Sequence, residues 1–256
     1  GRRELHPHSD IDLLVLMENE PNPALQSLIG QFLTFLWDIG LEIGHSVRTL
    51  AGCVTEASND LSIITNLMES RTVTGSIALH KSLGEQLAPQ HMWPSETFFR
   101  GKRHEQRQRH NKYNDTEYNL EPNVKSSPGG LRDIQTILWI AQRRFGMRSL
   151  ASLEAPGFLT ANEYQLLARS QAFLWRVRYA LHMLAGRAED RLLLDYQHKL
   201  AELFGFSGDD AKRAIEHFMQ QYYRTVMSVA ELSDFINQLY EESILRPTSS
   251  TPPTVL

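Results

Sequence analysis

Two aspartates at the leading edge of an apolar run constrain this chain more than any other feature. Asp10 and Asp12 are one residue apart, and the segment 11–17 that holds Asp12 is otherwise hydrophobic and has the length of a buried strand. Alternate side chains of a strand share a face, so the two carboxylates lie beside each other. Mg²⁺, which binds one or two carboxylates together with substrate phosphates, suits the space between two like charges. The alternative is a solvated strand end that binds nothing.

The composition is that of a soluble globular protein. The 256 residues are enough for one large domain or two ordinary ones. Of them, 41% are hydrophobic and 22% are charged. The formal net charge of −4 gives no overall field that favours nucleic acid. A single cysteine, Cys53, excludes an internal disulfide and suits a reducing compartment. No run is long enough to span a membrane and no signal peptide is visible, so we expect a cytoplasmic protein without nucleic-acid or membrane partners.

A helix and a second strand follow the aspartates. Apolar residues recur at helical spacing from Leu25 to Leu36, which predicts an amphipathic helix ending near Gly40. The segment 41–48 alternates between apolar and polar residues and predicts a strand, in which Gly44 marks a bulge or a close approach.

The polar face of this second strand carries candidate functional groups. Alternation places Glu42, Gly44 and Arg48 on one face. The Arg48 guanidinium is suited to neutralise carboxylates and phosphates, or to form an ion pair with Asp10 or Glu42. His45 lies among apolar neighbours on the opposite face, and we expect it to be structural.

Helical patterns and a basic stretch occupy the next part of the chain. The segments 60–75 and 77–87 have helical periodicity. The segment 99–112 holds six Lys and Arg residues against one Glu. We interpret it as the solvated face of a helix, with an electrostatic guide for a triphosphate or an acidic partner as the alternative.

A Pro-Gly-Gly loop at 128–130 opens onto a predicted helix. Helix N-termini present backbone N–H groups and the positive end of the helix dipole, which together form an anion site. Lys125 and Arg132 flank the loop. A tight turn before a well-capped helix is the alternative.

Beyond Gly146 the pattern is helical. A capping box at 160–163 precedes a long helix, the segment 190–203 predicts a shorter one, and 207–210 caps a last long amphipathic helix. Long amphipathic helices of this kind form a bundle. The Pro-, Ser- and Thr-rich segment 246–256 is expected to be a linker or a disordered tail.

Three strings in the sequence resemble one bacterial enzyme family. They are ELHPHSDIDLL at 4–14, NLMESR at 66–71 and NVKSSPGGLRD at 123–133. The chain resembles the N-terminal region of the bifunctional uridylyltransferase/uridylyl-removing enzymes of nitrogen regulation, members of the DNA polymerase β-type nucleotidyltransferase superfamily. The resemblance implies an α+β fold: a small polymerase β-like nucleotidyltransferase domain at 1–125, an all-α helical bundle at 126–245 and the tail at 246–256.

The resemblance also implies a reaction and its residues. It implies transfer of UMP from UTP to a tyrosine of the nitrogen-regulatory signal protein PII, with release of pyrophosphate and with Mg²⁺ held by Asp10 and Asp12. A third carboxylate is expected on the second strand, where Glu42 is the candidate and Asp60 the fallback, although a cousin family of protein adenylyltransferases places its acid where this chain has Gly44. The remaining residues expected to hold phosphate are Gly1, Arg2, Ser9, Arg48, Lys125 and Arg132.

The resemblance covers the front of the family architecture only. The chain contains no His-Asp pair, so the uridylyl-removing hydrolase and the glutamine-sensing domains are not expected in it. The family's Gly-rich turn begins upstream of Gly1, so we expect an incomplete phosphate cradle, a missing strand and weak activity of this chain alone. Two alternatives remain: a related transferase that uses another nucleotide or a small-molecule acceptor, and a non-catalytic regulatory fragment.

Overall fold

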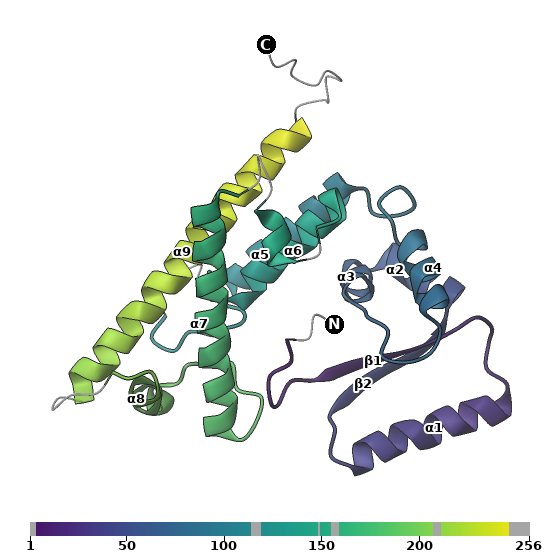
Figure 1. The fold of residues 1–256 in the computed structure, drawn as a ribbon, viewed down its shortest axis with the longest axis horizontal. Coiled ribbons are helices and arrows are strands. Elements are labelled where there is room, and N and C mark those ends of the chain that lie inside the picture. Colours follow the sequence, from purple (N-terminus) through teal and green to yellow (C-terminus); the bar gives the residue numbers. More distant parts are fainter. Residues whose placement is uncertain (1–3, 114–118, 148, 155–158, 207–210, 246–256) are drawn as a thin grey trace. The chain divides into compact units, whose positions relative to one another are not determined.

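The computed structural model describes residues 4–113, 119–147, 149–154, 159–206 and 211–245, and the structure is α+β (Figure 1). Contacts divide the chain into two compact units. The N-terminal unit comprises residues 1–101 and 185–188, and the helical unit comprises residues 102–184 and 189–256. The domain boundary after Lys125 stays a prediction; the division by contacts falls within a helix, between Gly101 and Lys102. The segments 207–210 and 246–256, predicted as a helix cap and a tail, lie outside the described residues.

A pair of parallel strands lies at the centre of the N-terminal unit. Strand β1 (Ile11–Met17) and strand β2 (Ile43–Thr49) pair in parallel along their whole length, and Asp12 lies opposite Gly44. The α1 helix (Pro23–Asp38) connects them, as a parallel pair requires. It lies on one side of the strands in Figure 1, and the helices of residues 50–86 lie on the other side. The predicted strand at 41–48 is therefore confirmed, with its start moved to Ile43.

Local caps explain where the α1 helix begins and ends. The side chain of Asn22 accepts a hydrogen bond from the Leu25 N–H at 2.9 Å, and Pro23 occupies the first helical turn. The helix ends before Gly40, whose φ of 85° suits glycine. The predicted helix is confirmed, but only one of its residues, Leu33, is buried.

The remaining helices of this unit form its core. They are α2 (Leu50–Asn59), α3 (Leu61–Met68), α4 (Ile77–Gln86) and the first part of α5 (Ser95–Asn111). Their fully or almost fully buried residues are Cys53, Ala57, Ile64, Leu83 and Phe98. The α2 helix was not predicted, because it follows β2 directly without a Gly or Pro between them. Thr49 ends the strand and caps the helix, accepting a hydrogen bond from the Gly52 N–H at 3.1 Å.

The helical unit contains the rest of α5 and four further α-helices, with one short 3-10 helix (Leu150–Leu153) between two of them. The α-helices are α6 (Leu131–Phe145), α7 (Ala161–Ala185), α8 (Leu194–Leu203) and α9 (Ala211–Leu245). The predicted capping box of α7 is confirmed: the Thr160 N–H donates to Glu163 Oε2 at 2.8 Å, and the Glu163 N–H donates to Thr160 Oγ1 at 3.3 Å. Phe218, Tyr222 and Val226 of α9 are buried, so its aromatic stripe is core. No described helix is both long and apolar enough to cross a membrane.

Candidate active site

The two aspartates lie exposed at the start of β1. The turn before them is closed by a pair of hydrogen bonds between residues 6 and 9: the Ser9 N–H donates to the His6 carbonyl at 3.0 Å, and the His6 N–H donates to Ser9 Oγ at 3.1 Å. This turn directs Asp10 and then Asp12 into the strand, where both side chains are solvent-exposed. Asp10 directly precedes β1 and Asp12 is its second residue, so the two exposed residues lie at the same end of the strand. That their carboxylates share a face stays a prediction from strand alternation.

The neighbouring strand brings Glu42 to the same end of the sheet. The Ile11 N–H donates to the Glu42 carbonyl at 3.0 Å, so Glu42 lies next to Asp10 just before β2 begins. Glu42 is exposed. Within the described residues, no three His, Cys, Asp or Glu side chains are close enough to share a metal ion, so Asp10, Asp12 and Glu42 are near neighbours rather than a closed ligand cluster.

Gly44 lies directly opposite Asp12. A Cβ atom built on Gly44 would lie 3.1 Å from Asp12 Oδ1, so the carboxylate extends over the glycine. A position without a side chain beside a carboxylate oxygen leaves room for a small divalent cation that keeps water or phosphate as its other ligands. The acid that the cousin adenylyltransferase family places here is absent from this position.

The other predicted residues of the N-terminal unit have structural contacts. Asp60 caps α3, accepting hydrogen bonds from the Ser62 N–H at 2.6 Å and the Ile63 N–H at 3.1 Å. Arg48 forms an ion pair with Glu56 on α2, at 3.9 Å, rather than with Asp10 or Glu42. His45 is exposed and packs edge-on against Trp37, with ring centroids 5.5 Å apart. Gly1 and Arg2 lie outside the described residues.

In the helical unit, Lys125 lies beside a partly buried acid, Asp190. Its Nζ is 4.0 Å from Asp190 Oδ2, and Asp190 Oδ1 also accepts from Arg178 Nε at 2.6 Å and lies 3.2 Å from His182 Nε2. Burial alone would raise the pKa of Asp190, but the Arg178 hydrogen bond and charge, His182 and Lys125 together lower it. Lys125 is thus one of three basic groups around one carboxylate.

The Pro-Gly-Gly loop is a structural turn, and the expectation of a backbone anion site there is wrong. The N–H groups that would bind an anion already donate within the chain. Gly129 donates to Asp133 Oδ2 at 2.7 Å, and Leu131 and Arg132 donate to the carbonyls of Val124 and Lys125 at 3.0 and 2.8 Å. The Arg132 guanidinium lies over the Trp139 ring, 5.2 Å from its centroid.

Asp133 organises this turn, and the sequence did not single it out. Its carboxylate is completely buried and accepts from Gln106 Nε2 at 2.8 Å and Arg109 Nη2 at 2.6 Å, with His110 Nε2 3.0 Å away. Burial would raise the pKa of Asp133, but the His110 hydrogen bond and the charge of Arg109 outweigh it and hold the pKa at about 2. An acidic residue in the first turn after a Gly-Gly pair is the signal that could have found it.

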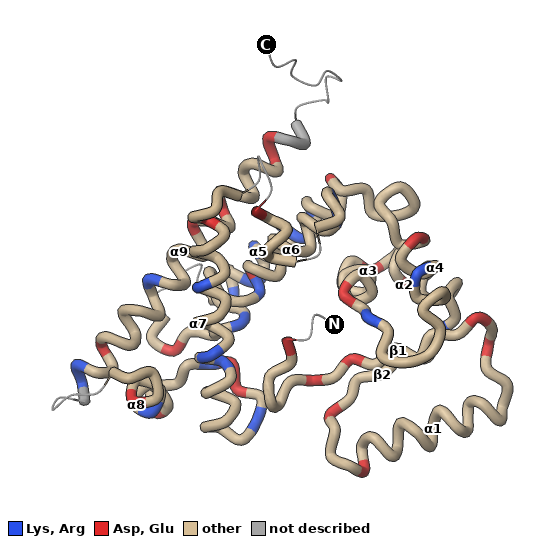
Figure 2. The backbone as a smooth tube through the Cα atoms, in the orientation of Figure 1, with Lys and Arg blue, Asp and Glu red and all other residues tan. Residues whose placement is uncertain are grey.

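Figure 2 marks the Lys and Arg positions along the backbone, including those of α5. The basic stretch there is partly interior, which corrects the prediction of a solvated face. Lys102 is 3% exposed, donates to Glu105 Oε2 at 2.8 Å and lies 4.9 Å from the Trp139 ring centroid. Arg109 contacts Asp133 as described. Arg100, Arg107 and Lys112 are the exposed members.

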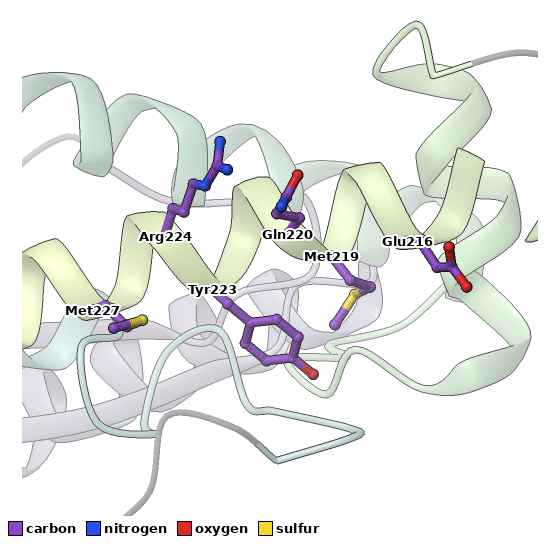
Figure 3. Close-up of a pocket in the computed structure, with 6 residues that line it drawn as sticks. All are labelled: Glu216, Met219, Gln220, Tyr223, Arg224 and Met227. Atoms are coloured by element: carbon purple, nitrogen blue, oxygen red, sulfur yellow. The ribbon is translucent and has the colours of Figure 1, made fainter. Parts of the chain in front are cut away.

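A separate hollow lies along α9 in the helical unit (Figure 3). Its volume is about 420 Å³, and it is lined by Glu216, Met219, Gln220, Tyr223, Arg224 and Met227. It contains none of the predicted site residues. The Tyr223 hydroxyl donates to the Asn119 carbonyl at 3.0 Å, which anchors one side of the hollow.

Fold and site together describe an α+β protein with an acidic edge on a parallel strand pair, followed by a helical unit. A family model described as GlnD PII-uridylyltransferase matches residues 97–236, more than half of the chain, and the chain belongs to this family.

Similar proteins carry a matching name. The chain is 60% identical over 253 residues to the bifunctional uridylyltransferase/uridylyl-removing enzyme of Pseudomonas fluorescens, which covers 99% of this chain and 28% of that protein. It is 59% identical over 256 residues to the enzyme of the same name from Ectopseudomonas mendocina, which covers 100% of this chain and 28% of that protein. The chain therefore spans little more than a quarter of the length of these relatives.

Proposed function

We propose that this chain is the uridylyl-transferring region of such an enzyme, with a polymerase β-like nucleotidyltransferase unit that moves UMP from UTP to a tyrosine of the PII signal protein and releases pyrophosphate. The observation that carries the proposal is the exposed pair Asp10 and Asp12 at the start of β1, with Asp12 beside the side-chain-free position Gly44. The family match and the name of the relatives support uridylyl transfer as the reaction.

Asp10 and Asp12 would hold Mg²⁺, whose hard-oxygen preference matches their carboxylates. When bound, the ion supplies charge neutralisation at the triphosphate and at the departing pyrophosphate. Glu42, exposed beside Asp10, is the proposed third carboxylate and would attract the tyrosine hydroxyl proton. The Ser9 hydroxyl, held in its turn by the His6 N–H, would donate to a phosphate oxygen.

Cationic side chains would supply the remaining phosphate contacts. Arg48, Lys125 and Arg132 stay the proposed residues, from the family resemblance. Gly1 and Arg2 stay proposed from the family resemblance. A charge-assisted hydrogen bond of this kind contributes about 1.5–3 kcal/mol.

A chimera tests the proposal. The segment of the Pseudomonas fluorescens enzyme that matches this chain is replaced by residues 1–256, and transfer of label from UTP to PII is measured with and without EDTA. We expect magnesium-dependent labelling from UTP, and its loss in an Asp12→Asn chimera of unchanged melting temperature, because removing one of two like charges does not weaken the fold. Labelling from ATP alone, or full labelling by the folded Asp12→Asn chimera, would contradict the assignment. An Asp38→Asn chimera, altered at an exposed aspartate at the end of α1, is the control.

A further inference from the structure

Gly44 occupies a strand position that does not need glycine. It lies inside β2, and its φ is not among the positive values found at other glycines such as Gly40 and Gly129. Any residue adopts an extended conformation. Glycine in the interior of a strand weakens the strand for two reasons. A glycine loses more conformational freedom on folding than other residues, and it has no side chain to pack against its neighbours. The fold alone would therefore favour a larger residue at this position.

The surroundings of Gly44 show what the missing side chain leaves room for. Among the residues that the structure describes, and apart from the chain neighbours of Gly44, Asp12 Oδ1 is the only atom within 4 Å of the position where a Cβ would be, at 3.1 Å. By contrast, Gly30 and Gly84 have open space at that position, and Gly101 faces the side chain of Leu61. Among the glycines in the described ranges, only Gly44 faces a carboxylate oxygen.

We propose that Gly44 is a positioning residue, which keeps the Asp12 carboxylate in the orientation that receives a divalent cation and the substrate phosphates. This inference rests on the proposed function. A Cβ at 3.1 Å from a carboxylate oxygen is closer than ordinary van der Waals contact, so even a methyl group forces Asp12 Oδ1 to move by a few tenths of an ångström. A carboxylate at position 44 would add a further negative charge beside Asp12. Glycine at this position leaves room for a cation that takes fewer ligands from the protein and more from substrate oxygens.

Binding of Mn²⁺ by the full chain tests the inference without an activity assay. Titrations followed by electron paramagnetic resonance measure the Mn²⁺ dissociation constant of the wild type, Gly44→Ala, Gly44→Val and, as a matched control, Gly30→Ala. We expect weaker binding of about threefold or more for Gly44→Ala, a larger loss for Gly44→Val, and no change for Gly30→Ala. The melting temperature of both Gly44 variants should hold or rise, since alanine and valine suit a strand better than glycine.

A fifth variant separates failure of this inference from failure of the proposed function. If Asp12→Asn weakens Mn²⁺ binding but both Gly44 variants bind like the wild type, the positioning role is wrong and the metal site stands. If neither Asp12→Asn nor the Gly44 variants change binding, or the wild type binds no Mn²⁺, the metal site itself is wrong and the positioning role falls with it. A large drop in melting temperature for Gly44→Ala would show that the glycine is needed by the fold, which also overturns the inference.

Discussion

Asp133 shows how one buried charge can hold a helix start, a loop and a neighbouring helix together. Its two oxygens accept from the Gly129 backbone and from side chains of α5. A buried carboxylate is tolerated only when it is paired and hydrogen-bonded, and here every contact favours the charged form except burial itself. The residue therefore links the pH of the solution to the stability of the helical unit.

The first prediction follows from this pKa. Asp133 has a folded-state pKa of about 2, below the ordinary value of about 3.9, so the folded state binds its proton less readily than the unfolded chain. Its contribution of roughly 2–3 kcal/mol is complete above about pH 5 and is lost as the pH falls through about 2. Urea unfolding at several pH values measures this slope. In Asp133→Asn the free energy of unfolding should change less with pH. The variant should also be destabilised by about 3 kcal/mol or more at pH 7, because Arg109 loses its partner.

Lys125 gives a second prediction at this scale. If it contacts the outer phosphates, Lys125→Ala should weaken UTP binding by roughly tenfold to a hundredfold and UMP binding far less. Equilibrium binding of both nucleotides, compared with Lys112→Ala at an exposed lysine on the same chain, measures the difference. An equal loss of affinity for both nucleotides would contradict the phosphate contact. It would instead reflect loss of the ion pair with Asp190, which affects the helical unit whichever nucleotide binds.

At the scale of elements, the turn before α6 depends on the absence of a side chain. Gly129 has a φ of 71°, and a Cβ there would lie 1.9 Å from the Val226 carbonyl oxygen of α9. Backbone cannot move aside as a flexible side chain can. The loop and α9 can approach this closely only because residue 129 is glycine.

The third prediction separates conformational strain from close packing. Gly146 also has a φ of 71°, but nothing lies within 4 Å of its Cβ position. Gly146→Ala should therefore lower the free energy of unfolding by about 1 kcal/mol, because only the left-handed conformation is unfavourable for alanine there. Gly129→Ala should cost about 3 kcal/mol or more, or prevent folding of the helical unit. Chemical denaturation of the two variants checks this, and equal losses would mean that α9 shifts to accommodate the methyl group.

Local sequence patterns predicted the elements whose signals are short-range. The apolar run at β1, the periodicity of α1 and α4 and the capping box of α7 depend on residues a few positions apart. The burial of Lys102 and the pairing of Lys125 with Asp190 could not be predicted this way, because each depends on residues brought together by tertiary packing. The carboxylates of the candidate site could be proposed from the sequence because Asp10 and Asp12 are alternate residues at the start of one predicted strand. The contact of Asp12 with Gly44 could not, because it depends on the register of the two strands.

At the scale of the whole molecule, membership of the family and the candidate site rest on different parts of the chain. The matched residues 97–236 lie mostly in the helical unit, whereas Asp10 and Asp12 lie in the N-terminal unit. The similarity to the Pseudomonas fluorescens enzyme covers both units. If the proposed site is right, we expect a variant of the aspartates to lose transfer while the helical unit keeps its structure.

The burial of Cys53 in α2 allows opening of the N-terminal unit to be followed by chemical modification. It is the single cysteine of the sequence, its side chain is 0% exposed, and burial raises the pKa of its thiol against the lowering effect of Arg48. Alkylating reagents attack the thiolate, so iodoacetamide can modify this sulfur only while α2 has opened away from its neighbours. We expect the rate, followed by mass spectrometry, to be far below that of an unfolded peptide and to rise with urea. A rate equal to that of the peptide in native buffer would show that the N-terminal unit does not stay closed. The mass increment on a modified molecule would thus record that its N-terminal unit has opened.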